Sequence, residues 1–187
     1  MNRYSELGSI VTRIVIVATL AMLAGLAVAC GDDDDDDDDT AVATESDRFD
    51  VVRDELAQYD SVEKAQAAGW DLVEGLDHCF DNPGVGAMGF HYIDAERLDT
   101  EVDDMAPEAL IYAPGEDGEL RLVGVEYIVP GEPWDEENPG VLPAVMEIPF
   151  HLNSELGVYV LHAWLFHDNP AGLLQDWNPT VVCPPQA

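Results

Sequence analysis

The sequence predicts an α+β fold in which short N-terminal helices pack on a mainly antiparallel β-sheet. Phe49, Val52 and Leu56 recur at the three- and four-residue spacing of one helix face. From Trp70 onward, short apolar runs alternate with turn residues, which is the pattern of β-strands. Because the loops between successive runs are short, neighbouring strands are expected to be antiparallel.

Two helices are expected before the strands. Ser46 has the side chain of an N-cap, so the first helix and the folded domain are expected to begin directly after it. A second short helix is expected at about 61–68, because Asp60 and Glu63 have the spacing of a capping box and Gly69 favours termination. Helices this short are stable only when they pack against a larger element, and the sheet is expected to be that element.

Six apolar runs are predicted as strands, at residues 87–93, 109–113, 120–129, 143–152, 159–166 and 180–183. The run 159–166 is apolar on both faces except for His162, which is typical of a central strand. Segments rich in proline, glycine and acidic residues are expected as turns or loops, at residues 81–84, 114–118 and 130–140.

The N-terminal segment has the features of a signal peptide, predicted over residues 1–29. Residues 14–29 carry no charge, and this run is shorter than the roughly 20 apolar residues that span a bilayer. The sequence Leu26-Ala27-Val28-Ala29 before Cys30 resembles the lipobox of bacterial lipoproteins, which implies that Cys30 is lipidated, for example with palmitate. An uncleaved anchor, or an ordinary signal peptide with an incidental cysteine, is the alternative.

Residues 30–46 are predicted to be a tether behind the lipidated cysteine. Residues 32–39 are all aspartate, and this run cannot fold because like charges repel and nothing is available to bury. A calcium-collecting role is a second interpretation, although the run lacks the shaped loop of an ordered calcium site. The remaining residues, 47–187, are expected to form a single globular domain.

The charge balance restricts the partners of the protein. The chain has 39 acidic and 7 basic residues, a net charge of −32. No basic patch can be assembled, which excludes nucleic acid as a partner and leaves the lipid as the means of membrane attachment. A cation or a small-molecule ligand remains as a partner, beside the alternative that the acidic surface only keeps the protein soluble.

The cysteines predict one disulfide bond. Of the three cysteines, lipidation uses Cys30 and leaves Cys79 and Cys183, which are expected to pair outside the cytoplasm. Such a bridge closes a loop of about a hundred residues, which corresponds to roughly 4–5 kcal/mol of chain-entropy stabilisation. A redox-active pair, the alternative, more often has Cys-x-x-Cys spacing.

A series of short motifs gives the chain a family resemblance. After the expected helix, with the sequence YDSVEKAQAAGW, come the motifs MGFHY, GVEYIV, LHAWLF followed by NPAG, and WNP followed by a cysteine. In this order the motifs resemble a family of uncharacterised bacterial secreted proteins and lipoproteins, over roughly Phe49 to Pro184. The resemblance implies an extracytoplasmic domain and assigns no catalytic residue.

Three polar residues interrupt apolar strands: His91, Glu126 and His162. A buried carboxylate needs compensation, and few arginines are available to supply it. If the three side chains share one face of neighbouring strands, their two imidazoles and one carboxylate suit Zn²⁺ or another first-row transition metal. The alternatives are a buried hydrogen-bond network that sets strand register, and a small-molecule or catalytic site.

Other candidate residues have simpler interpretations. Trp164 and Trp177 can line an apolar ligand-binding pocket or fill the core. His167 is expected to cap the turn at 168–170. The sequence contains no Gly-rich phosphate loop, GxSxG elbow, HExxH motif or Cys-x-x-Cys pair.

The expected function is that of a lipoprotein anchored on the extracytoplasmic side of a bacterial membrane. Its histidine-lined sheet is expected to bind a metal ion such as zinc, or a small ligand. The alternative is an extracytoplasmic enzyme in which Glu126 or His162 acts as a general base.

Overall fold

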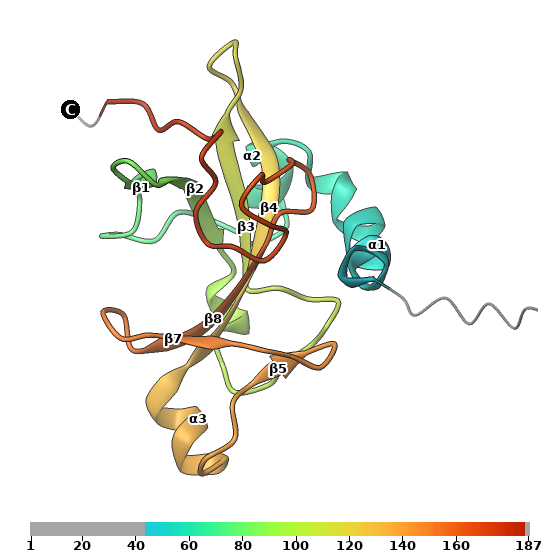
Figure 1. Ribbon diagram of the computed structural model, residues 1–187, viewed down its shortest axis with the longest axis vertical. Coiled ribbons are helices and arrows are strands. Elements are labelled where there is room, and N and C mark those ends of the chain that lie inside the picture. Colours follow the sequence, from blue (N-terminus) through green and yellow to red (C-terminus); the bar gives the residue numbers. More distant parts are fainter. Residues whose placement is uncertain (1–43, 186–187) are drawn as a thin grey trace, which may run out of the picture. The chain divides into compact units, whose positions relative to one another are not determined.

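The computed structural model describes residues 44–185 (Figure 1). The predicted signal peptide, Cys30 and the aspartate run lie outside the described residues. Within the part of the chain that is described, no helix has both the length and the apolar character needed to cross a membrane.

An antiparallel sheet of six strands forms the centre of the fold, in the order β1-β2-β3-β4-β8-β7. Its strands are β1 (Phe80–Asn82), β2 (Gly86–Ile93), β3 (Ala109–Pro114), β4 (Leu120–Pro130), β7 (His151–Asn153) and β8 (Val158–Ala163). A separate small hairpin joins β5 (Ala144–Val145) to β6 (Ile148–Pro149). The predicted α+β class and the antiparallel sheet are confirmed.

Short helices precede the sheet, as predicted. Helix α1 (Glu45–Leu56) begins after Thr44, earlier than expected from Ser46. The reason is a capping box, because the Thr44 hydroxyl accepts from the Asp47 N–H and the Asp47 carboxylate accepts from the Thr44 N–H. Helix α2 (Val62–Ala67) follows, with single-turn 3-10 helices at Ala57–Tyr59 and Ala95–Arg97.

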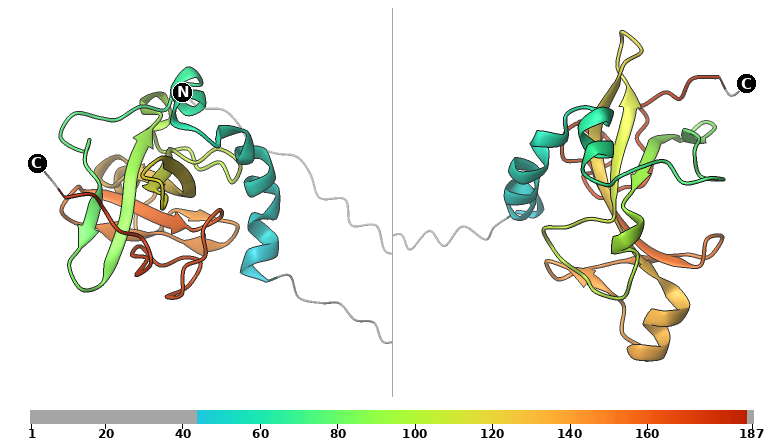
Figure 2. Two further views of the ribbon diagram at one scale, coloured as in Figure 1. Left: turned by 90° about the horizontal axis from the view of Figure 1, so that it is seen from above. Right: turned by 180° about the vertical axis from the view of Figure 1, so that it is seen from behind.

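The two faces of the sheet bury two different apolar clusters, since successive strand residues point to opposite sides. One cluster joins strand residues such as Tyr112 and Tyr127 to Phe49 and Val52 of α1. The other lies under the C-terminal segment 164–185, which contributes Trp164 and Val181 among others. In Figure 1 this segment (red) crosses in front of the sheet, and the view from behind in Figure 2 brings α1 and α2 forward.

Covalent and backbone bonds attach the C-terminal segment to the rest of the domain, among them the bond that the Phe166 N–H donates to the Val123 carbonyl of β4 at 3.1 Å. The predicted disulfide between Cys79 and Cys183 is confirmed, and Asn178 forms a backbone bridge with Ala87 of β2. The expected strand at 180–183 is wrong, because this segment has no strand pairing there. His167 Nε2 lies 3.0 Å from the Thr180 hydroxyl.

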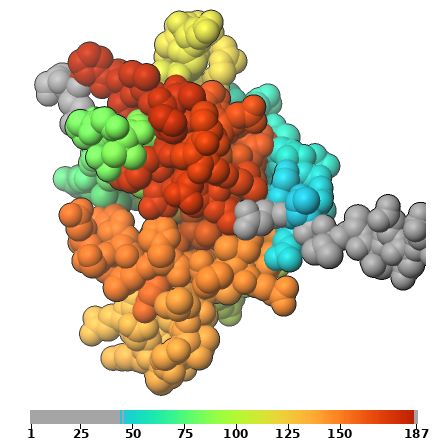
Figure 3. Space-filling model, viewed as in Figure 1, coloured from blue at the N-terminus to red at the C-terminus, as the bar shows by residue number. Residues whose placement is uncertain are grey.

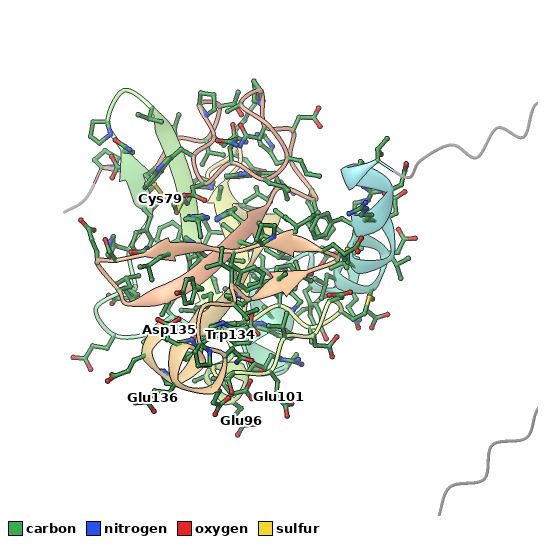
Figure 4. The ribbon with its side chains drawn as sticks, turned by 60° about the horizontal axis from the view of Figure 1, so that its bottom comes forward. Cys79, Glu96, Glu101, Trp134, Asp135 and Glu136 are labelled. Carbon is green, nitrogen blue, oxygen red and sulfur yellow. A yellow bond between two sulfur atoms is a disulfide. The ribbon has the colours of Figure 1, made fainter. Side chains whose placement is uncertain are left out.

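Two expectations around residues 130–153 are also wrong. Helix α3 (Gly131–Glu137; Figure 4) occupies the expected loop, since a proline is tolerated in the first turn of a helix. The expected strand at 143–152 is divided into β5, β6 and the start of β7. Met146 and Glu147 cause the division, because both adopt left-handed conformations with φ of 49° and 67° and reverse the chain.

Candidate metal centre

Three neighbouring regions of the sheet bring His91, Glu126 and His162 to one place. Glu126 on β4 is directly opposite His162 on β8. Strand β3 lies between β2 and β4, and its residue opposite Glu126 is Ala109. On β2, His91 is opposite Ile111 and Ile93 is opposite Ala109, so His91 and Glu126 lie diagonally across β3.

The three side chains lie close to the spacing of a metal-ligand set. His91 Nε2 lies 3.3 Å from Glu126 Oε2, and His162 Nδ1 lies 4.0 Å from Glu126 Oε1. One ligand atom from each residue lies within 4.8 Å of the other two. Tetrahedral zinc with bonds of about 2.0–2.2 Å needs its ligand atoms about 3.4 Å apart. Side-chain rotations that shorten the widest separation by about 1–1.5 Å therefore complete the set.

All three residues are buried, and His162 lacks hydrogen bonds. The exposed fractions are 6% for His91, 8% for Glu126 and 0% for His162. Among residues 44–185, neither Nδ1 nor Nε2 of His162 has a hydrogen-bond partner. A buried polar group left in this state costs about 1–3 kcal/mol, and a bound cation would remove that cost for the one ring nitrogen that coordinates it.

Burial also changes the protonation of the site. It raises the pKa of Glu126 to about 8, and the negative charges of Asp176 and Glu108 add to the rise. It lowers the pKa of His91 to about 4, and it lowers the pKa of His162 well below the ordinary value. Near pH 7 and without a cation, all three groups are therefore mainly uncharged. A divalent cation in their midst would favour the ionised carboxylate.

Aromatic rings form the walls of the site. The rings of Phe80 and His91 form a T-shaped contact, with centroids 5.0 Å apart, and the indole of Trp164 stacks on His162 at 5.1 Å. Trp164 is 3% exposed and its Nε1 donates to the Gln175 carbonyl at 2.6 Å. Trp164 thus has the position of a core residue that orients His162, and its role as a ligand-binding residue stays a prediction.

Two further acidic groups near the site were not anticipated from sequence. Glu108 is 3% exposed, its Oε2 accepts from the Ile128 N–H at 2.7 Å, and burial raises its pKa to about 7. Asp176, on the C-terminal segment, pairs with His151 of β7 at 3.1 Å. Neither residue interrupts an apolar run, so the sequence offers no signal for them.

The donor set determines which ions fit. Two imidazole nitrogens and one carboxylate oxygen suit zinc and its first-row neighbours, whereas calcium and magnesium prefer oxygen ligands alone. Three protein ligands leave one position of a tetrahedron open for water or another small ligand. The apolar walls would keep that position in a poorly solvated environment.

Comparisons with protein-family models, with curated proteins and with solved structures find no match to this chain. The chemistry of the site therefore has to be inferred from its own residues.

Proposed function

We propose that this protein is a lipid-anchored extracytoplasmic domain that binds a transition-metal ion, foremost zinc, through His91, Glu126 and His162. The observation that carries the proposal is the state of His162. It is fully buried, both of its ring nitrogens lack partners among the described residues, and it lies beside a carboxyl group.

A purely structural hydrogen-bond network explains these contacts less well. In a network, each buried nitrogen is expected to have a partner at normal hydrogen-bond distance. Here the shortest contact within the group is the 3.3 Å separation of His91 and Glu126, and His162 stays 4.0 Å from the carboxyl. A central ion would satisfy the carboxylate and one nitrogen of each ring at the same time.

The location in the cell envelope is supported by two features of different origin. The lipobox-like sequence before Cys30 and the aspartate run suit an anchored protein with a tether. The bond between Cys79 and Cys183 suits an oxidising compartment outside the cytoplasm.

Metal titration of the folded domain, purified without a histidine tag, tests the binding. Cobalt is a useful probe because its visible absorption reports on the ligands and their number. We expect one tightly bound ion in the wild type, with loss of binding in Glu126→Gln and His162→Gln. Glu108→Gln is the matched control, since it also alters a buried carboxyl but outside the ligand set, and it should bind normally. A wild type that takes up no ion would leave the internal network as the explanation.

An extracytoplasmic enzyme with Glu126 or His162 as general base is the second candidate. The pKa of about 8 for Glu126 favours it, because proton-transfer groups work best with a pKa near the operating pH. The small exposure of both residues opposes it, since a substrate would have to displace the covering side chains. A small molecule bound beside Glu126 in a crystal structure of metal-free protein would support the enzyme over the metal-binding domain.

A further inference from the structure

An exposed histidine–aspartate pair lies at the edge of the sheet, on the side of β7. His151 Nε2 is 3.1 Å from Asp176 Oδ2, and the two side chains are 51% and 30% exposed. They come from different parts of the chain, His151 from β7 and Asp176 from the C-terminal segment. Figure 3 shows these two regions (orange and red) meeting on one face of the molecule.

The pair lies on the same face of the sheet as the buried site. His151 is directly opposite Val160 of β8, and Val160 shares its face with His162 two residues later. His151 and His162 are therefore diagonal neighbours across adjacent strands. Such positions are about 7–8 Å apart, within reach of long side chains.

Asp176 is held near the site by Trp164. The indole of Trp164 stacks on His162, and its Nε1 donates to the carbonyl of Gln175, the residue before Asp176. The electrostatic effects agree with this position. The charge of Asp176 contributes to the raised pKa of Glu126, and that of His151 contributes to the lowered pKa of His162, in both cases after burial itself.

We infer that His151 and Asp176 form an outer, transient binding position through which a metal ion reaches the buried site. This inference rests on the proposed function. The pair offers one imidazole and one carboxylate, which are the same ligand types as the inner site. A hydrated ion bound there would exchange part of its water for protein ligands before it moves inward, which divides the cost of desolvation into two steps.

The opposite side of the site is less suited to this role. There the ring of Phe80 packs against His91, and the centroid of the His78 ring lies 4.2 Å from that of Phe80. Asp81 is an exposed carboxylate on that side, on β1, so the two sides can be compared by matched substitutions.

Stopped-flow measurement of cobalt and zinc uptake tests the inference. Asp176→Asn and His151→Gln are compared with Asp81→Asn and His78→Gln, which make the same chemical changes at the other edge. We expect the association and dissociation rates to fall together by about fivefold or more in the first two variants, and the dissociation constant to change by less than about threefold. The two control variants should bind at wild-type rates. Circular dichroism of each variant verifies the fold.

The following results would overturn the inference. Wild-type rates in Asp176→Asn and His151→Gln, or equal slowing in His78→Gln, would place the route elsewhere. Faster release with unchanged association in Asp176→Asn would make Asp176 a ligand of the bound ion. A wild type that binds the ion at equilibrium, with no rate change in the variants, refutes the route alone. A wild type that binds none refutes the proposed function and the route together.

Discussion

Glu126 shows how a single buried carboxyl sets the behaviour of the site. Burial raises its folded-state pKa to about 8, against about 4.3 in an unfolded chain. Between these values the folded state holds a proton that the unfolded state has released. The contribution of Glu126 to the stability of the metal-free protein is therefore lost as the pH rises from about 5 to about 8.

The variant Glu126→Gln should lack this loss while keeping the shape of the side chain. With chelator present, the unfolding free energy of the variant relative to the wild type should rise by about 2–4 kcal/mol between pH 5 and pH 8. Urea denaturation at several pH values measures it. Glu108, whose pKa burial also raises, is present in both proteins. Parallel stability curves over this range would contradict the assignment.

The two buried histidines change the stability with pH in the direction opposite to Glu126. The folded-state pKa of His91 is about 4, so the unfolded state binds an extra proton at this residue between about pH 4 and 6.5. Stability from this source falls as the pH drops through that range, and His162 acts in the same direction. The metal-free wild type is thus expected to be most stable near neutral or slightly acid pH.

Sequence alone indicated His91, Glu126 and His162 because each interrupts an apolar strand. It could not indicate Asp176, which approaches Glu126 only through the path of the C-terminal segment. Glu108 was missed for a related reason, since it closes a polar stretch just before β3. Its burial depends on the Ile128 N–H of the neighbouring strand.

At the scale of the elements, β3 and β4 were well predicted and the region after them was not. Both strands are apolar on each face and end at clear turns, so their observed bounds differ from the predicted ones by one residue. The composition wrongly predicted a loop at α3, because the proline and glycine at the start of this helix are also typical of loops. The composition also gave no sign that the chain reverses between β5 and β6, because the reversal occurs at Met146 and Glu147, residues that rarely adopt positive φ.

Strand β2 depends on Gly89, which is two residues before His91. Gly89 has φ +112°, and a Cβ atom there would lie 2.5 Å from the Tyr112 carbonyl oxygen of β3. Gly89→Ala should therefore separate β2 from β3, cost about 2 kcal/mol or more in unfolding free energy, and weaken metal binding. Gly118→Ala is the control, since it has φ +81° and open space around the added atom. If the two variants lose equal amounts of unfolding free energy in thermal or chemical denaturation, the close approach of Gly89 to Tyr112 is contradicted.

The C-terminal segment depends on its disulfide. Replacing both Cys79 and Cys183 by alanine should lower the unfolding free energy by about 2–5 kcal/mol, because the bond constrains a long loop of the unfolded chain. Chemical denaturation measures the change, and hydrogen exchange should rise in residues 164–183. Cys30→Ser is the control that keeps the bridge. Unchanged hydrogen exchange in this segment would mean that its packing on the sheet holds it in place without the disulfide bond.

At the scale of the whole molecule, the anchor stays a prediction from sequence. If Cys30 carries the lipid, Cys30→Ser should move the protein from the detergent phase to the aqueous phase in a phase-separation experiment. The physical reason is that an acyl chain contributes about 0.8 kcal/mol per buried methylene to membrane binding. A variant that remains in the membrane would show that the N-terminal apolar run is an uncleaved anchor.

The protein as a whole combines a strongly acidic chain with a buried, nearly uncharged site. The net charge of −32 attracts cations to its surroundings without selecting among them. Selection is expected from the two imidazoles and one carboxyl group in the sheet, whose nitrogen donors discriminate against calcium and magnesium.

Diffraction from zinc-soaked crystals, recorded at the zinc absorption edge, tests the central proposal most directly. We expect an anomalous peak about 2.0–2.2 Å from His91 Nε2, from a Glu126 oxygen and from one ring nitrogen of His162. Crystals of Glu126→Gln grown and soaked in the same way should lack this peak. Zinc found only at exposed side chains in the wild type, with the buried group unchanged, would contradict the account.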